Sequence, residues 1–179
     1  MKVLLDACVL YPTVMREVLI GAAKAGLYQP LWSDRILEEW RRAAARSGPV
    51  DGMQAEGEIA LLRGAFPEAS VQEFEHIEQR LYLPDSGDLH VLAAAIKGHA
   101  DIIVTLNAKD FPRHTLAEEG IERLDSDQFM LRLCDDAPEA VGQVVETVRA
   151  AAEHMDDAPR DIRPLMKKAR MPRLGKRLG

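Results

Sequence analysis

Acidic and amide side chains stand at three points where an apolar run meets a turn or a helix. Asp6 follows the run "KVLL", Asp88 precedes the Ala-rich stretch "HVLAAA", and Asn107 and Asp110 follow the β-branched run "DIIVT". In an open parallel sheet, the carboxyl ends of the strands meet at one edge and form the ligand crevice. We therefore expect these side chains to lie close together.

A cluster of this kind predicts a bound cation. Carboxylates brought close together repel one another, and their pKa values rise unless positive charge compensates. Hard oxygen ligands favour Mg²⁺ or Mn²⁺ over Zn²⁺. The acids therefore indicate a site for one of these two ions.

Each of these residues also has a purely structural explanation. Asp6 can cap a helix or lie in a loop, and Asp88 can cap a helix start, a role that Asp85 or Ser86 could fill equally well. The polar residues after "DIIVT" can form a turn. At the level of single residues, both explanations stay open.

Four short apolar runs predict the strands of a parallel sheet: "KVLLD", "QPLW", "DIIVT" and "GIERL". The Ala-rich helix before "DIIVT" is expected to end near Lys97, with Gly98 as its stop. A helix that feeds a buried strand is the repeating piece of a parallel α/β sheet. Its small side chains allow it to pack close to the sheet.

Helical periodicity predicts that much of the first half of the chain is helical. A helix is expected over 13–25, with Gly26 as its stop, and Ser33 is a natural N-cap for the helix that follows. The apolar stripe of that second helix consists of Ile36, Leu37, Trp40 and Ala44. Weaker patterns predict helical pieces over 53–66 and 71–80.

The last third of the chain is predicted to be helical. One helix is expected from Asp125 or Ser126 to Cys134, and a second over 138–154, opened by a proline. Residues 162–171 form an amphipathic turn or two. These helices follow the last predicted strand, so they extend the α/β core.

Length and charge limit the organisation. With 179 residues, 47% of them hydrophobic, the chain can bury one core, so we expect one domain with an appendage. The chain holds 23 basic and 29 acidic residues, and the segment from residue 159 onward holds eight of the basic and one of the acidic. The body therefore carries −13 and the tail +7.

Cysteine usage and hydropathy indicate an intracellular protein. Cys8 and Cys134 lie far apart and lack metal-binding spacing, so we expect reduced thiols. No stretch approaches the roughly 18 apolar residues of a membrane span, and the N-terminus lacks a signal-peptide pattern. We therefore expect a cytoplasmic protein without membrane contact.

Four segments together resemble a known family. "VLLDACVLYP", "SDRILEEW", "DLHVLAAAI" and "IVTLNAKDF", in this order, are similar to the four acidic motifs of PIN-domain ribonucleases, especially the VapC-type toxins of bacterial toxin–antitoxin pairs. The resemblance covers about residues 1–130. The chain further resembles a longer branch of this family, which has a helical extension after the PIN core. The resemblance implies a PIN-like three-layer α/β fold with a central parallel sheet flanked by helices. The domain is expected over 1–135, and a helical extension with a basic tail over 136–179.

The resemblance also assigns the site. Asp6 takes the first acidic position, Glu39 the second, Asp88 the third, and Asn107 with Asp110 the fourth. The implied catalytic residues are Asp6, Glu39, Asp88 and Asp110, and the implied metal ligands are Asp6, Glu39, Asp88 and Asn107. Many relatives have aspartate at the position of Asn107, so one or two metal ions remain possible.

The second acid comes from the resemblance alone. Glu38 and Glu39 are both ordinary exposed helix residues by their pattern, and the motif selects the second. Near the other motifs, Thr105, Lys109 and Arg113 are the expected substrate-binding residues. His90, two residues after Asp88, could also approach the site.

The family implies metal-dependent cleavage of RNA. One or two Mg²⁺ (or Mn²⁺) ions activate water as the nucleophile, and the products carry 5′-phosphate and 3′-hydroxyl ends. The partners that the resemblance implies are RNA, a cognate antitoxin and, in a homodimer, a second copy of the chain. Three roles stay open for the basic tail, namely RNA binding, antitoxin docking or a flexible solvated end. The spacing of Leu165, Met166, Met171 and Leu174 also allows partial folding on a partner.

Two other functions compete with this assignment. Phosphatases of the haloacid dehalogenase type also place an aspartate after a first strand, and they have a second aspartate two residues later. In this chain that position is occupied by Cys8. A catalytically silent PIN-like module could bind RNA or protein without cutting. Such a module is expected to have lost acids, whereas Asp6, Glu39 and Asp88 are all present.

Overall fold

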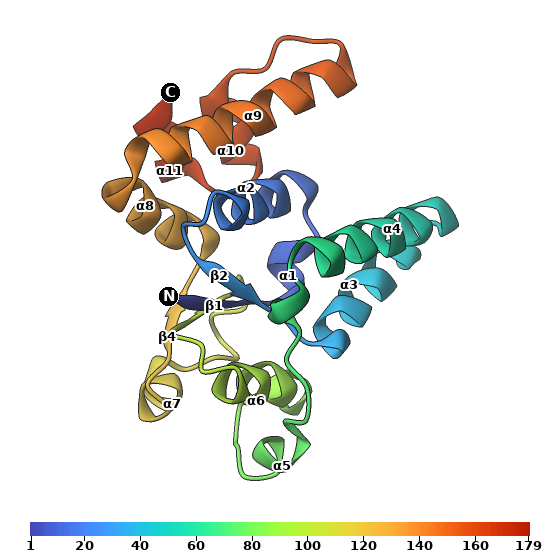
Figure 1. Cartoon of the computed structure of the whole chain (residues 1–179), viewed down its shortest axis with the longest axis vertical. Coiled ribbons are helices and arrows are strands. Elements are labelled where there is room, and N and C mark those ends of the chain that lie inside the picture. The colour runs from blue at the N-terminus through green and yellow to red at the C-terminus, as the bar shows by residue number, and fades with distance from the viewer. The chain divides into compact units, whose positions relative to one another are not determined.

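A short parallel sheet organises the first part of the chain. The computed structural model describes residues 1–179, with the side chain of Asp156 left out of the description. The strands are β1 (Lys2–Leu5), β2 (Gln29–Leu31), β3 (Ile102–Val104) and β4 (Glu122–Leu124). Their order is β2-β1-β3-β4, and every pairing is parallel (Figure 1).

Helices make up most of the described chain. The helices up to the last strand are α1 (Ala7–Leu10), α2 (Thr13–Lys24), α3 (Asp34–Ser47), α4 (Pro49–Ala65), the 3₁₀ turn η1 (Pro67–Ala69), α5 (Glu75–Glu78), the 3₁₀ turn η2 (Ser86–Asp88), α6 (Leu89–Lys97) and α7 (Arg113–Glu118). After β4 come α8 (Ser126–Asp136), α9 (Pro138–Asp156), α10 (Ile162–Lys168) and α11 (Pro172–Leu178). The expected fold class, a parallel sheet flanked by helices with further helices at the C-terminus, is confirmed.

The chain forms two compact units, which we describe separately. The sheet unit comprises residues 1–11 and 29–124, and the helical unit comprises residues 12–28 and 125–179. The helical unit therefore combines α2 with the four C-terminal helices. These units reflect packing within the chain, so the domain limits expected from the sequence, 1–135 and 136–179, stay a prediction.

The core of the sheet unit forms where α6 packs on the strands. The apolar side chains of β1 and β3 are almost completely buried, and so are Ala93, Ala94 and Ala95 of α6, which lies against β1 (Figure 1). The alanines allow this close approach because they add little volume between helix and sheet. The caps agree with the sequence, since the Ser33 hydroxyl accepts a hydrogen bond from the Ile36 backbone at 3.2 Å.

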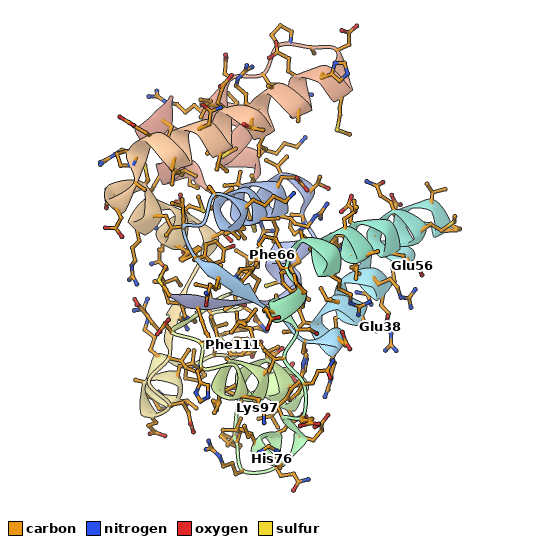
Figure 2. The ribbon with its side chains drawn as sticks, in the orientation of Figure 1. Glu38, Glu56, Phe66, His76, Lys97 and Phe111 are labelled. Carbon is orange, nitrogen blue, oxygen red and sulfur yellow. The ribbon has the colours of Figure 1, made fainter. Side chains whose placement is uncertain are left out.

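The helix expected over 71–80 is wrong except for its last part. The Val71 N–H donates to the Trp32 carbonyl at 2.8 Å, and the Trp32 N–H donates to the Ala69 carbonyl at 3.0 Å. Ser70 is extended in this parallel bridge next to β2, and Glu73 adopts a left-handed conformation with φ at 59°, so only Glu75–Glu78 is helical. The Trp32 ring also meets Phe66, labelled in Figure 2, edge to face at 6.0 Å.

The helical unit holds together through close helix contacts. At Gly21 in α2, an added Cβ would come within 2.7 Å of Val144 in α9, so only glycine allows this approach. The Tyr28 ring packs edge to face on Phe129 in α8 at 5.0 Å, and its hydroxyl donates to the Leu19 carbonyl. Helix α8 begins with a capping box between Asp125 and Gln128.

The basic tail is folded. Four of its apolar residues, Leu165, Met166, Met171 and Leu174, are buried. The Asp127 carboxylate in α8 accepts hydrogen bonds from the backbone N–H groups of Arg173 and Leu174 at 3.1 and 2.9 Å and so caps α11. The alternative of a flexible solvated end is therefore wrong. Across the described residues, no helix is both long enough and apolar enough to cross a bilayer.

Candidate metal centre

Asp6 lies at the carboxyl end of β1 and is held by two side chains. Its Oδ2 accepts a hydrogen bond from the Thr105 hydroxyl at 2.7 Å and one from the Cys8 thiol at 3.1 Å. Although Asp6 precedes α1, its side chain makes no capping hydrogen bond to that helix. Both protein donors use the same oxygen, so Oδ1 is left for a ligand.

Thr105 and Cys8 connect the ends of β1 and β3. The Thr105 hydroxyl is buried and also accepts from the Asn107 backbone N–H at 3.0 Å. The Cys8 sulfur accepts from the Leu106 N–H at 3.2 Å. Burial and the negative charge of Asp6 raise the pKa of Cys8 to about 12, so the thiol keeps its proton and donates to Asp6. Substrate binding by Thr105 stays a prediction, while the structure shows its hydroxyl engaged with Asp6.

Asp88 belongs to a compact group of three aspartates. Carboxylate oxygens of Asp85, Asp88 and Asp110 all lie within 4.8 Å of one another. Asp85 accepts a hydrogen bond from the Gly87 N–H at 2.8 Å and caps η2, whereas the Asp88 side chain caps nothing. The capping explanation therefore fits Asp85 and not Asp88.

The pKa of Asp88 shows how close the acids are. This pKa is raised to about 6, first by burial and then by the negative charges of Asp6, Asp85, Asp110 and Glu39, in that order. Four other carboxylates thus act on Asp88, and the five residues come from four separate stretches of the chain. We call these five residues the acidic cluster.

The structure distinguishes the two glutamates of α3. Glu38 binds the guanidinium groups of Arg41 and Arg42, each at 2.7 Å, and these arginines lower its pKa to about 2. Figure 2 shows Glu38 on α3 and Glu56 on α4, and Arg41 also lies 3.6 Å from the Glu56 carboxylate. Glu38 is thus part of a surface charge network. Glu39 is the glutamate that joins the acidic cluster.

Glu39 lies against a fully buried histidine. Nε2 of His90, in the first turn of α6, is 2.8 Å from Oε1 of Glu39. The ring N–H is not directed at this oxygen, and neither ring nitrogen of His90 has a hydrogen bond among the described residues. The pair is therefore a close polar contact, and it connects α3 to α6 at the rim of the cluster.

Asn107 connects the third and fourth acidic positions. Its amide nitrogen donates to Oδ2 of Asp88 at 2.9 Å, and the Asp110 N–H donates to the Asn107 carbonyl at 3.3 Å. The amide oxygen of Asn107 remains free to bind a cation. A carboxylate at this position would repel Asp88, so the amide holds Asp88 without adding negative charge.

The two expected basic residues differ in position. Lys109 Nζ is 3.9 Å from Asp110, and the lysine side chain is 85% exposed. Arg113 is exposed at the start of α7, and no contact joins it to the cluster within the described part of the chain. Only Lys109 therefore stands next to the acids, and substrate binding by either residue stays a prediction.

The structure thus brings together Asp6, Glu39, Asp88, Asn107 and Asp110, all proposed from the sequence. It adds Asp85 and Cys8, whose sequence context had indicated only a capping residue and a reduced thiol. The spacing of Asp85 from Asp88 was the available signal, because three residues span one 3₁₀ turn. A set of carboxylate and amide oxygens fits a hard divalent cation, since such an ion would relieve the repulsion that raises the pKa of Asp88.

Comparison with known proteins gives two matches. A family model described as the PIN domain matches residues 2–109, a stretch that contains every member of the acidic cluster except Asp110. The chain is also similar to the "Putative ribonuclease VapC50" of Mycobacterium tuberculosis (strain ATCC 25618 / H37Rv), at 43% identity over 58 residues. That match covers 32% of this chain and 34% of the relative, about a third of each. No solved structure matches the chain.

Proposed function

The chain belongs to the PIN domain family, and on that premise we propose that it is a metal-dependent endoribonuclease, the toxin of a toxin–antitoxin pair. The observation that carries the proposal is the acidic cluster, in which three aspartates have oxygens within 4.8 Å of one another and burial together with four further carboxylates raises the pKa of Asp88. Such repulsion is tolerable in a folded protein when a cation binds. The printed name of the relative, a putative ribonuclease, supports RNA as the substrate.

The residues that would hold Mg²⁺ or Mn²⁺ are Asp6, Asp88 and Asp110, with Glu39 and Asn107 beside them. When bound, the ion supplies a Lewis acid that lowers the pKa of water and neutralises charge on the phosphate. Asp6 and Asp88 each use Oδ2 for hydrogen bonds within the protein, so each offers Oδ1 to the ion. The number of bound ions, one or two, depends on which of the carboxylates of Asp85, Glu39 and Asp110 act as ligands.

The surrounding residues orient these acids before any ligand arrives. Thr105 and Cys8 fix the direction of the Asp6 carboxylate, and Asn107 fixes that of Asp88. Preorganised ligands spare the site the cost of ordering them during binding. At the rim, the exposed Lys109 ammonium can contact a phosphate of the RNA.

The wider biology is proposed from the family. A cognate antitoxin, a homodimer and a cytoplasmic location all fit a VapC-type toxin. An antitoxin that blocks the acidic cluster would suppress RNA cleavage, and coexpression with the neighbouring reading frame would reveal it. We therefore propose RNA and an antitoxin as the two partners of the sheet unit.

The test is RNA cleavage by purified protein. We expect fragments of a labelled RNA in the presence of Mg²⁺ or Mn²⁺ and none in EDTA. Asp6→Asn should abolish cleavage and leave the fold intact, because removing a repelling carboxylate does not destabilise the metal-free protein. Cleavage that persists in EDTA, or an active Asp6→Asn variant with an unchanged circular dichroism spectrum, would contradict the proposal.

A further inference from the structure

Exposed cations gather on the last two helices of the helical unit. Five of them lie on α10, on the turn after it or on α11, and we call them the basic platform: Arg163, Lys167, Lys168, Arg170 and Lys176. Each side chain is exposed, and none of the five has an ion-pair partner within the described part of the chain. Their charge is therefore open to solvent.

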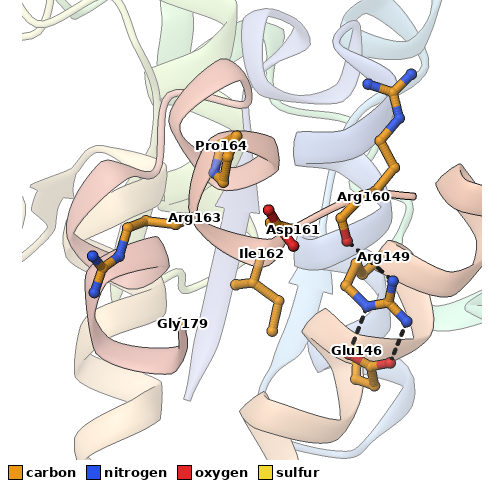
Figure 3. Close-up of a pocket in the computed structure, with 8 residues that line it drawn as sticks. All are labelled: Glu146, Arg149, Arg160, Asp161, Ile162, Arg163, Pro164 and Gly179. Atoms are coloured by element: carbon orange, nitrogen blue, oxygen red, sulfur yellow. Dashed lines mark hydrogen bonds and ion pairs between the residues drawn. The ribbon is translucent and has the colours of Figure 1, made fainter. Parts of the chain in front are cut away.

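Other arginines of the same unit are neutralised. Arg173 binds Asp127 at 3.0 Å, and Arg177 binds Asp135 at 3.0 Å. In the adjoining cavity of about 570 Å³, Arg149 forms two hydrogen bonds with Glu146 (Figure 3). Figure 3 also shows the Arg163 guanidinium directed away from that pair. Paired arginines hold the helices together, and unpaired cations remain at the surface.

The platform is rigid because its two helices pack closely. An added Cβ at Gly175 in α11 would come within 2.9 Å of Met166 and 3.2 Å of the Arg163 carbonyl in α10. Arg170 adopts a left-handed conformation, with φ at 59°, in the turn that joins the helices. The backbone that carries the cations is thus folded before a partner binds, so only the exposed side chains have to be ordered on binding.

The composition of this surface favours RNA over an acidic protein. Protein interfaces have an apolar core and are depleted in lysine. Here the large apolar side chains of the two helices are buried or half-buried, so lysine and arginine dominate what is exposed. Nucleic-acid interfaces are polar and strongly positive, as this surface is.

We propose that the basic platform binds the phosphate backbone of single-stranded RNA, separately from the acidic cluster. The inference rests on the proposed function only in taking RNA as the substrate. A site built from carboxylates repels phosphates, so affinity for the chain must come from cations elsewhere. The platform supplies that affinity without reading base sequence, because phosphate contacts carry no sequence information.

The experiment measures binding without cleavage. The full-length Asp6→Asn variant in EDTA is titrated against a fluorescein-labelled polyuridine oligonucleotide, and anisotropy is followed from about 50 to 200 mM salt. Adding Arg163→Gln, Lys167→Gln and Lys176→Gln should flatten the slope of log K against log salt by about 2, at 0.7 per phosphate contact. At about 0.1 M salt this corresponds to a loss of about 100-fold in affinity.

A matched control removes the same charge elsewhere. Lys24→Gln, Arg46→Gln and Lys97→Gln together change three exposed cations outside the platform and should leave the slope unchanged. Exchanging lysine and arginine at the three platform positions should preserve binding and shows that charge is the property required. The thermal midpoint of each variant should match that of the Asp6→Asn background, because all six side chains are exposed.

Three results would overturn the inference. The platform variant could bind polyuridine with an unchanged salt slope, or the control variant could lose as much affinity. The platform variant could also lose binding to polyglutamate while it retains binding to polyuridine, which would assign the surface to an acidic protein. These outcomes are distinct from failure of the proposed function, since a chain that binds RNA through the platform but never cuts it leaves this inference standing.

Discussion

The acidic cluster of the sheet unit and the basic platform of the helical unit concentrate charge in opposite ways. The cluster gathers carboxylates from α3, from η2 and from the ends of β1 and β3, and it holds them close enough to raise the pKa of Asp88. The platform spreads its cations over a short stretch from Arg163 to Lys176, each open to water. The first arrangement costs free energy until a cation binds, whereas the second costs little.

This difference indicates two kinds of ligand. Like charges held at short range in a partly buried site predict a compact ion of opposite charge. Solvated charges spread along two helices predict an extended polyanion, which is attracted through counterion release. Substitutions in and around the acidic cluster test the first kind of site, and substitutions in the basic platform test the second.

The largest effect on cleavage is expected from Glu39, and Glu38, the other glutamate of α3 next to it, provides the control. Glu39→Gln should reduce cleavage by more than about 100-fold, beyond the range typical of residues that only support a metal ligand. Glu38→Gln is the matched control, since Glu38 faces Arg41 and Arg42 and should leave the rate nearly unchanged. Rates are compared under single-turnover conditions at saturating Mn²⁺. Equal losses in both variants would show that Glu39 has no special place in the cluster.

A smaller effect is expected where the protein orients Asp6. Thr105→Val removes the hydroxyl that donates to Asp6 and should weaken Mn²⁺ binding by about 10- to 100-fold. Isothermal titration calorimetry measures the affinity, and Thr115→Val in α7 serves as the control. If Thr105→Val binds Mn²⁺ as tightly as the wild type does, Cys8 alone is sufficient to hold Asp6.

The smallest effect concerns the stability of the metal-free protein. The native pKa of Asp88, about 6, lies above its ordinary value of 3.8, so the native state binds this proton more tightly than the unfolded state does. Stability gained from protonation is present below pH 4 and is lost as the pH rises through about 6. Metal-free protein should therefore be less stable at pH 7 than at pH 5 through this group.

Replacing Asp88 isolates that contribution. Asp88→Asn should raise the thermal midpoint at pH 7 by about 2–4 °C, the shift given by about 1 kcal/mol in a chain of this size. We expect no more because Asp88 is only half-buried and solvent screens its repulsion. Calorimetry in EDTA should show the gain at pH 7 and no gain near pH 4. A gain of equal size at both pH values would trace the effect to packing and not to charge.

Most of the element boundaries can be predicted from local sequence signals. The Ser33 cap, the glycine stops at Gly26 and Gly98, and the start of the 138–156 helix at its proline all follow from interactions within a few residues. The positions of Asp6 and Asn107 at strand ends were also legible, because an apolar run ends where a polar residue begins. Such local signals can be recognised without knowledge of the rest of the chain.

The contacts within the site depend on how distant segments pack together. The hydrogen bond from Thr105 to Asp6 joins residues 99 apart, and the contact of His90 with Glu39 crosses from α6 to α3. Glu38 and Glu39 have the same local pattern, and only the packing of α3 directs one to the cluster. The sequence pattern after Val71 predicts a helix, but the segment directly after it is not helical, because backbone pairing with Trp32 outweighs local propensity. Contacts between distant segments depend on how the whole chain packs, which local periodicity does not encode.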